Sequence, residues 1–426
     1  MGPCRLNRTH RTYETDLSHA SHLSYKSYSQ INGGAAVRLH SGDGFVPRRP
    51  PHFCRIVLCA VAAGDTLLRM KITYPMGMAL LAGAFLLAGC GGQSDADGAK
   101  KPIKLTYSVF FPPAHAQAKL AVAWGEEITR RTDGRVKVAV FAGGALTKAD
   151  QCYQGVVDGI SDVGMSAFAY TRGRFPLLAG LDLPVGYPDG ISATQIANEM
   201  AEQFNPDETK DTKLLYVHAH GPGVLATKKP VAKLADLRGL KIRATGFCAK
   251  IVETLGGSPV GMPQGETYEA LQKGVADATF CPMETLKGWK QAEVIQYVTD
   301  SRCVGYTTAF FVTMNKERWD ELPPDVRRVI AEVSKEWIAK HGQAWNDADA
   351  EARIYIDELK REVVTLDAEE QKAWVRRVDP VLVDYVTRTT RAGLQGAVFL
   401  NELKMRVIGA REGAPGKAKT AGEGTR

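Results

Sequence analysis

The segment Asp236–Arg243 has the sequence DLRGLKIR and decides how the rest of the chain is interpreted. Apolar and basic side chains alternate from Leu240 to Ala244, which predicts a short strand. The residues before Gly239 can form one helical turn, and a new helix is expected to follow the strand. Arg243 is therefore predicted at the carboxyl end of a strand, where the chain turns into a helix.

An arginine at such a position predicts a binding site for a carboxylate. In open α/β sheets, ligands bind beyond the carboxyl ends of the strands. A guanidinium group is a flat fork of donors that fits a carboxylate with two parallel hydrogen bonds. The alternative is that Arg243 is a surface residue paired with a neighbouring acidic side chain, because charged side chains are usually exposed.

Strands and helices alternate along most of the chain, which predicts two α/β lobes. Strands are expected at residues 104–110, 135–141, 162–168, 213–218, 224–227, 240–244, 259–262, 277–281, 294–299 and 306–314. Helices are expected at residues 115–131, 148–157, 189–204, 248–255, 264–273, 283–291, 323–361 and 366–390.

The predicted boundaries are residues 103–221 for lobe I, 222–305 for lobe II and 306–322 for a return to lobe I. Two crossings between lobes make a hinge, and the cleft between lobes is a favoured ligand site. A long helix is predicted at 323–361, with proline in its first turn as expected. C-terminal helices are predicted at 362–408. Residues 409–426 are predicted to be a disordered tail, because they are rich in Gly, Ala, Lys and Glu.

The N-terminal part of the chain has the features of an export signal. A short basic region at Met70 precedes an apolar run, and Leu87–Cys90 reads LAGC, which resembles the bacterial lipobox. The run is short for a bilayer span but has the length of a signal-peptide core. We predict a signal peptide at 70–89, lipid attachment at Cys90, a tether at 90–102, and a non-native extension at 1–69. The alternative is an uncleaved anchor helix.

Charge and composition exclude several classes of function. The chain has 426 residues, 44% of them hydrophobic, which is enough for sizeable cores. Of its net charge of +7, residues 1–89 contribute +6, with ten Lys/Arg against four Asp/Glu. The folded part therefore has no basic field, and a nucleic-acid partner is not predicted.

The chain shows no motif for a cofactor or a metal. Walker, GxGxxG, HExxH and GxSxG motifs are all absent from the sequence. No cysteine has a C-x-x-C spacing or belongs to a Cys/His cluster, so a zinc or haem site is not expected. We predict no cofactor, no metal and no enzymatic activity.

Four sequence motifs resemble the DctP-type substrate-binding proteins of TRAP transporters. The similarity covers roughly residues 103–390, and the motifs occur in order and at the family spacing. They are TDGRVKV at Thr132–Val138, GVVDG at Gly155–Gly159 with DVG at Asp162–Gly164, DLRGLKIR at Asp236–Arg243, and YEALQKGVAD at Tyr268–Asp277.

This resemblance implies a two-lobed, periplasmic-binding-protein-like α/β fold with a long helix that spans both lobes. It implies an extracytoplasmic, periplasmic receptor that delivers an organic acid to the small and large membrane subunits of a TRAP permease. The family arginine that pairs with the ligand carboxylate corresponds to Arg243. The family's other cleft positions correspond to Gln264, Cys281, Phe168, Tyr170 and Phe111.

Two departures from the family pattern narrow the expected ligand. Sialic-acid-binding members have a second arginine where this chain has Gly223, and Cys281 replaces a polar amide. A sugar acid or a dicarboxylate is therefore less expected than an apolar or aromatic monocarboxylate. The aromatic candidates for the cleft are Phe111, Phe168, Tyr170, Phe247 and Trp289, and the alternative role for each is packing in the core.

Other reactive side chains have structural explanations. Cys248 and Cys281 could form a disulfide if their Cα atoms lie within about 7 Å, and free buried thiols are the alternative. Glu266 and Glu284 suit helix starts, where the dipole favours acidic residues, rather than acid/base chemistry. His115 is interpreted as a capping or surface histidine, with ligand contact as the alternative.

Two alternative functions remain. One is a periplasmic sensory receptor that presents a carboxylate to a membrane kinase or chemoreceptor. The other is a periplasmic enzyme on the same scaffold, which would need a nucleophile–base pair or a metal cluster in the cleft.

Overall fold

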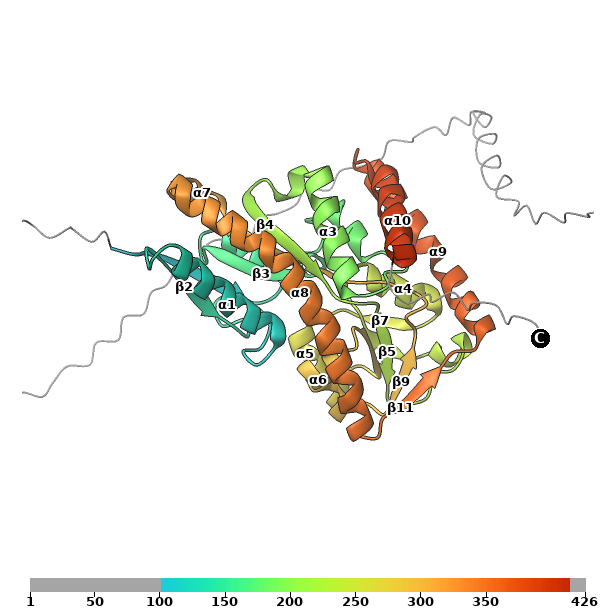
Figure 1. The fold of residues 1–426 in the computed structure, drawn as a ribbon. Coiled ribbons are helices and arrows are strands. Elements are labelled where there is room, and N and C mark those ends of the chain that lie inside the picture. Colours follow the sequence, from blue (N-terminus) through green and yellow to red (C-terminus); the bar gives the residue numbers. More distant parts are fainter. Residues whose placement is uncertain (1–100, 414–426) are drawn as a thin grey trace, which may run out of the picture. The chain divides into compact units, whose positions relative to one another are not determined.

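Two separate β-sheets organise the chain in the computed structural model, which describes residues 101–413 (Figure 1). All of these residues belong to one unit, Gly91–Arg426. The predicted N-terminal extension, the signal peptide with Cys90 and most of the tether lie outside the described residues, as do residues 414–426.

The first sheet forms lobe I and has the strand order β2-β1-β3-β10-β4. Its strands are β1 (Ile103–Val109), β2 (Val136–Phe141), β3 (Val163–Ala167), β4 (Thr212–Ala219) and β10 (Ala309–Asn315). The second sheet forms lobe II and has the order β11-β9-β5-β8-β6-β7. Its strands are β5 (Val224–Thr227), β6 (Lys241–Arg243), β7 (Ser258–Val260), β8 (Ala278–Cys281), β9 (Tyr297–Asp300) and β11 (Glu362–Thr365).

Each sheet contains one antiparallel strand, and both of these strands follow a crossing between lobes. β10 runs antiparallel to β3 and β4, and β5 runs antiparallel to β8 and β9. The chain leaves lobe I between β4 and β5 and returns between β9 and β10. The remaining strands of each sheet are parallel, so their carboxyl ends lie at one edge of the sheet. In open α/β sheets, ligands bind beyond this edge.

Helices pack on both sheets. In lobe I, α1 (Ala116–Arg131) contacts β2, α2 (Cys152–Val157) contacts β3, and α3 (Gly190–Phe204) contacts β4. In lobe II, α4 (Gly246–Leu255) contacts β7 and α5 (Gln264–Gln272) contacts β8. The remaining helices are α6 (Thr285–Gly288), α7 (Lys316–Glu321), α8 (Pro324–Glu358), α9 (Ala368–Arg391) and α10 (Gly396–Gly413), with short 3-10 turns η1 (Phe168–Tyr170), η2 (Leu178–Asp182), η3 (Asp207–Thr209), η4 (Leu234–Leu237) and η5 (Gln291–Glu293).

The long helix α8 joins the two lobes (Figure 1). Its 35 residues span about 50 Å at the usual rise per residue. It packs on α1, α3 and β4 of lobe I and on α6 of lobe II. Val333 and Trp337 belong to the core of lobe I, whereas Ala352 and Ile356 belong to the core of lobe II. The spanning helix that the family resemblance implied is therefore present.

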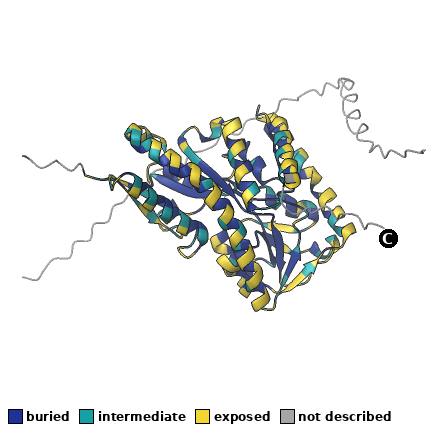
Figure 2. Ribbon diagram, in the orientation of Figure 1, coloured by how far each residue is buried: buried dark blue, intermediate teal, exposed yellow. Residues whose placement is uncertain are grey.

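The C-terminal helices also tie the lobes together. α9 packs on α4 of lobe II, and α10 packs on α3 of lobe I. A third core cluster contains Leu181 and Phe311 of lobe I, Ile251 of lobe II, and Tyr385 of α9. Figure 2 shows the strands mostly buried and the outer faces of the helices exposed, as expected for sheets covered by amphipathic helices.

Most predicted strands and helices are present, and four differences lie between residues 283 and 413. The predicted helix 283–291 is divided into α6 and η5 because Lys290 adopts a left-handed conformation, with φ of 58°. β11 follows α8 directly and adds an edge strand parallel to β9. The helix α7 was not predicted. α10 continues to Gly413, so residues 409–413 are helical and the prediction of disorder is wrong for them.

The crossing segments touch each other at Gly223. The N–H of Gly223 donates to the Tyr306 carbonyl at 3.2 Å, which pairs the outgoing and returning segments. A β-carbon at residue 223 would lie 2.1 Å from Cε1 of Tyr306. Glycine is required here because the tyrosine ring occupies the space of a side chain.

We predict that Gly223→Ala lowers the free energy of unfolding by about 1–3 kcal/mol, the usual cost of overpacking a filled site. Urea denaturation would measure this change. Gly409→Ala is the matched control, because a β-carbon at residue 409 would have no heavy atom within 4 Å and alanine is favoured in helices by about 0.5–1 kcal/mol. Equal effects of the two substitutions would contradict the packing argument.

Asp182 is a buried carboxyl group between η2 and β10. The residue is 2% exposed, and its Oδ1 accepts a hydrogen bond from the N–H of Ala309 at 2.9 Å. Burial raises the pKa of Asp182 to about 8. The folded protein thus holds a proton here that the unfolded chain releases near pH 3.9, roughly the ordinary value for aspartate. Between these values the free energy of unfolding falls as pH rises.

Asp182→Asn should remove this pH dependence, because the amide oxygen can still accept from Ala309 but does not titrate. The stability of the variant relative to the unchanged protein should rise as pH increases from about 4 to about 8. Urea denaturation across that range would test this, with Asp379→Asn at an exposed site of α9 as control. Parallel pH profiles for all three proteins would refute the assignment.

Candidate functional site

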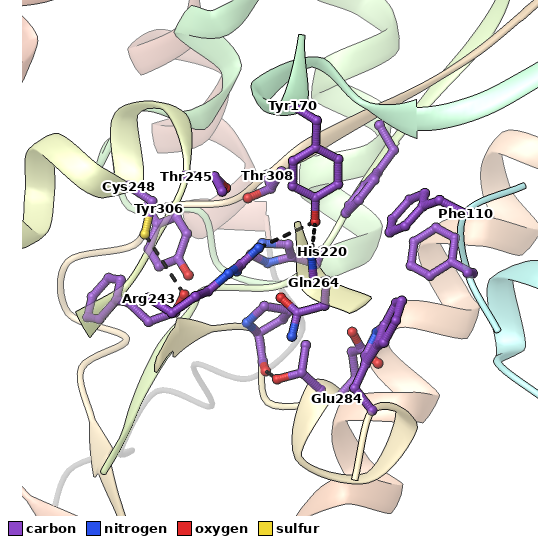
Figure 3. Close-up of a pocket in the computed structure, with 16 residues that line it drawn as sticks. Phe110, Tyr170, His220, Arg243, Thr245, Cys248, Gln264, Glu284, Tyr306 and Thr308 are labelled. Atoms are coloured by element: carbon purple, nitrogen blue, oxygen red, sulfur yellow. Dashed lines mark hydrogen bonds between the residues drawn. The ribbon is translucent and has the colours of Figure 1, made fainter. Parts of the chain in front are cut away.

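A cavity lies between the two lobes, where the strand ends of both sheets meet. It encloses about 400 Å³ of space, including solvent at its mouth. Lobe I contributes residues that follow β1, β3 and β4, and lobe II contributes residues at the ends of β6 and β8 (Figure 3). The lining residues are Phe110, Phe111, Tyr170, His220, Arg243, Thr245, Cys248, Gln264, Phe280, Pro282, Glu284, Thr285, Trp289, Tyr306, Thr308 and Phe310.

Arg243 is the cationic residue of this cavity. It ends β6, is 5% exposed, and donates from Nε and Nη2 to the carbonyl oxygen of Met262 at 3.1 and 3.0 Å. No carboxylate of residues 101–413 lies within salt-bridge distance of its guanidinium group. The alternative of a surface arginine paired with an acidic neighbour is therefore wrong, and the positive charge is available to a ligand.

Tyr170 of lobe I meets Arg243 of lobe II across the cavity (Figure 3). Its hydroxyl oxygen accepts from Nη2 of Arg243 at 3.4 Å and from the backbone N–H of Gln264 at 3.1 Å. A tyrosine hydroxyl also has one hydrogen to donate. Tyr170 and Arg243 can therefore both donate to the same carboxylate when the lobes are closed.

Aromatic rings form most of the cavity wall opposite Arg243. The ring of Phe110 stacks on Trp289 and on Phe310, each with centroids 6.0 Å apart, and meets Tyr170 edge to face at 5.5 Å. Trp289 comes from lobe II, so the stack crosses the cleft. Such rings bury a large apolar area and prefer stacked or edge-to-face arrangements.

His115 and Glu284 form a buried hydrogen bond between the lobes. His115 caps α1, because its Nδ1 accepts from the N–H of Gln117 at 3.2 Å. Nε2 must then carry the hydrogen, and it donates to Oε2 of Glu284 at 2.8 Å. Both side chains are 2% exposed. The sequence-based interpretation of His115 as a cap is confirmed, although the side chain is buried rather than on the surface.

The spanning helix α8 also contacts this pair. Oδ1 of Asp349 accepts from the backbone N–H of Glu284 at 2.9 Å. Burial, with a smaller contribution from the charge of Glu284, raises the pKa of Asp349 to about 7. Lobe I, lobe II and α8 therefore meet at one polar cluster beside the cavity.

Five of the eight predicted ligand-contact residues line the cavity, namely Phe111, Tyr170, Arg243, Gln264 and Trp289. Cys281 does not, because it is fully buried in the core of lobe II. Phe168 packs against Phe175 and Phe311, and Phe247 packs against Tyr385 of α9. Both of these rings border a separate open groove next to α9.

Among the lining residues that the sequence reasoning missed are His220, Tyr306, Thr308 and Phe310. His220 directly follows β4, so the rule that strand ends line the cleft could have identified it. The other three precede or begin β10, which runs antiparallel, and they reach the cavity at the amino end of a strand. Sequence alone gave no sign that β10 is antiparallel.

The described thiols are free. Cys152, Cys248, Cys281 and Cys303 form no disulfide, so the bond considered between Cys248 and Cys281 is absent. Within residues 101–413, no group of three or more His, Cys, Asp or Glu side chains could hold a metal ion. The same residues include no helix that is both long enough and apolar enough to cross a membrane.

Residues 107–388 match the DctP family, described as "Bacterial extracellular solute-binding protein, family 7". This chain belongs to that family. The resemblance to TRAP transporter substrate-binding proteins, and the two-lobed fold that it implied, are thereby confirmed.

Solved structures of TRAP solute-binding proteins are similar to this member of the DctP family along most of its length. One from Rhodoferax ferrireducens, in complex with copurified benzoate, is 28% identical, with 73% of this chain and 99% of that chain covered and a TM-score of 0.69. Another, from Bordetella bronchiseptica with bound (R)- and (S)-mandelate, is 30% identical, with 72% and 99% covered and a TM-score of 0.68.

A solute-binding protein of Roseobacter denitrificans is 26% identical over 221 residues, which are 50% of this chain and 66% of that protein.

The His115–Glu284 bond should contribute to stability as a coupled pair. We expect His115→Asn and Glu284→Ala each to lower the free energy of unfolding by about 3–5 kcal/mol, because each leaves the other buried polar group without its hydrogen-bond partner. Asparagine at residue 115 can still cap α1. A double-mutant cycle by urea denaturation should give a coupling energy of about 0.5–3 kcal/mol.

The exposed pair Lys287–Glu351 is the matched control for this cycle. Its Nζ and Oε2 atoms lie 2.9 Å apart and join lobe II to α8, whereas His115–Glu284 joins lobe I to lobe II. The side chains of the control pair are 46% and 62% exposed. Its coupling should stay below about 1 kcal/mol. A coupling between His115 and Glu284 no larger than this would show that the buried bond does not hold the lobes together.

Proposed function

We propose that this DctP-family protein binds an aromatic or apolar monocarboxylate between its lobes and delivers it to a TRAP membrane permease. The observation that carries the proposal is Arg243, whose buried guanidinium group faces the cavity without an acidic partner among residues 101–413. A buried cation is stable only when it is paired or hydrogen-bonded. A ligand carboxylate would supply the missing charge.

The charge of the cavity supports a single carboxylate. Arg243 is the one lysine or arginine among its lining residues, and Glu284 adds an acidic group that is bonded to His115. A second ligand carboxylate would find no second cation there and would lie near an acidic side chain. Dicarboxylates are therefore expected to bind more weakly than monocarboxylates.

The wall of the cavity supports an aromatic or apolar body for the ligand. Phe110, Phe310 and Trp289 present stacked rings, and Phe280 and Tyr306 stack with centroids 4.9 Å apart. The benzoate and mandelate found with the two similar receptors are aromatic monocarboxylates. Transfer from water to such a wall favours ligands that bury apolar area.

The remaining parts of the proposal follow from family membership and from the N-terminal sequence. The receptor works outside the cytoplasm with the small and large membrane subunits of a TRAP permease. Lipid attachment at Cys90 would hold it on the membrane, since two or more acyl chains give stable anchoring. The protein binds its ligand without catalysis.

Arg243→Ala should weaken binding of the best monocarboxylate by about 2–5 kcal/mol, the range for breaking a buried charged contact. Calorimetric titration of aromatic, aliphatic and 2-oxo acids would identify that ligand, and a saturating ligand at a hundred times its Kd should add about 2.7 kcal/mol of stability. Arg238→Ala, an exposed arginine of the same DLRGLKIR segment, is the control and should bind normally. Undiminished binding by Arg243→Ala would rule out the site.

A further inference from the structure

The cavity contains a buried polar atom that carboxylate binding at Arg243 does not use. His220 follows β4, is 1% exposed and lines the cavity. Its Nδ1 makes a hydrogen bond with the carbonyl oxygen of Gly221. Its Nε2 is buried and has no hydrogen-bond partner among residues 101–413.

The bond to Gly221 determines which nitrogen carries the hydrogen. A carbonyl oxygen can only accept, so Nδ1 of His220 must donate. Burial, together with the charge of Arg243, lowers the pKa of His220 to about 4, so the ring is neutral at neutral pH. A neutral imidazole has one hydrogen, and Nε2 is therefore a bare acceptor at the cavity wall.

Two further buried groups in the cavity wall are unpartnered donors. They are Nε1 of Trp289 and Nε2 of Gln264, neither of which has a partner among residues 101–413. Of the buried polar atoms in the cavity wall that have no hydrogen-bond partner among residues 101–413, one is thus an acceptor and two are donors. Figure 3 shows His220, Gln264 and the end of Arg243 in the same part of the cavity, below Tyr170.

We propose that Nε2 of His220 accepts a hydrogen bond from a hydroxyl group of the ligand and so selects hydroxylated monocarboxylates. This inference rests on the proposed function, in which Arg243 holds the carboxylate. A hydroxyl group that donates to His220 keeps its lone pairs free to accept from another donor of the cavity. An oxo group or an ether oxygen can accept but cannot donate, so either would leave Nε2 unpaired.

An amine is a poorer partner for His220 than a hydroxyl group. A protonated amine would place a positive charge close to Arg243, whose charge already acts on His220. Like charges at short range in a buried site repel strongly. The structure therefore assigns a neutral donor to this position, which in a small organic acid is a hydroxyl group.

Calorimetric titration of matched acids on the full-length protein tests the inference. The probes are benzoate with its 2-, 3- and 4-hydroxy and methoxy derivatives, and phenylacetate with mandelate and phenylglyoxylate. At least one hydroxylated acid should bind about tenfold or more tightly than its parent, ether or oxo analogue. Tenfold corresponds to about 1.4 kcal/mol, within the range for a buried hydrogen bond.

His220→Phe and His220→Gln show whether this preference comes from His220. Phenylalanine has no acceptor, so the preference for the hydroxylated acid over its parent should fall to about twofold or less. Glutamine can place an amide oxygen near the position of Nε2 and should retain part of the preference. Thermal unfolding checks that each variant folds. If a variant does not fold, the comparison of ligands on the unchanged protein still tests the predicted preference for hydroxylated acids.

The outcomes separate this inference from the proposed function. If parent acids bind in an Arg243-dependent manner but no hydroxylated acid is preferred, or if His220→Phe keeps the preference, the role of His220 is refuted and the proposed function stands. If no acid of the panel binds the unchanged protein, both proposals fail. A hydroxyl preference that His220→Phe removes and His220→Gln partly restores supports the inference.

Discussion

The proposed binding site depends on one buried positive charge, that of Arg243, which has no acidic partner among the described residues. Arg243 is held by the carbonyl oxygen of Met262 and the hydroxyl oxygen of Tyr170, neither of which carries a formal charge. Removing a guanidinium group from water is unfavourable, and neutral dipoles offset this cost only in part. In the proposed function an incoming carboxylate would complete the compensation, so the same feature that weakens the ligand-free closed form would favour the ligand-bound form.

The two-lobed architecture makes this compensation dependent on closure. Arg243 belongs to lobe II and Tyr170 to lobe I, so their contact exists only when the lobes approach each other. The His115–Glu284 bond and the aromatic stack of Phe110 and Trp289 also cross the cleft. A ligand that binds the closed arrangement more tightly than the open one shifts the population toward closure. The paired crossing segments, α8 and the C-terminal helices connect the lobes.

The sequence predicts most of the fold because each lobe repeats simple periodic patterns. Alternating strands such as β2, and helices with clear ends such as α3, follow from local chemistry. The unpredicted elements depend on contacts far along the chain. β11 lies next to β9, and its residues become a strand only because that edge is available after α8 ends. The break between α6 and η5 rests on the conformation of a single residue, Lys290.

The candidate site residues were predicted at strand ends that border the cavity, but not always on the face that lines it. Side chains alternate along a strand, so Phe280 faces the cavity while Cys281 points into the core of lobe II. In the helix α4, two consecutive residues also point in different directions. Phe247 packs toward α9, whereas Cys248 lines the cavity. Family patterns locate the end of a strand, but which side chain faces the cavity depends on the register and twist of the folded sheet.

Gly223 shows how the crossing segments also limit the ligand. A second arginine at this position would suit a ligand with more anionic or polar groups, yet the ring of Tyr306 occupies the space that any side chain at residue 223 would need. Tyr306 itself lines the cavity and stacks on Phe280. The contact between Gly223 and Tyr306 thus places an aromatic ring at the hinge where a cationic side chain could otherwise lie. The proposed preference for a single carboxylate on an apolar body, and the close contact between the two crossing segments, would then have the same physical origin.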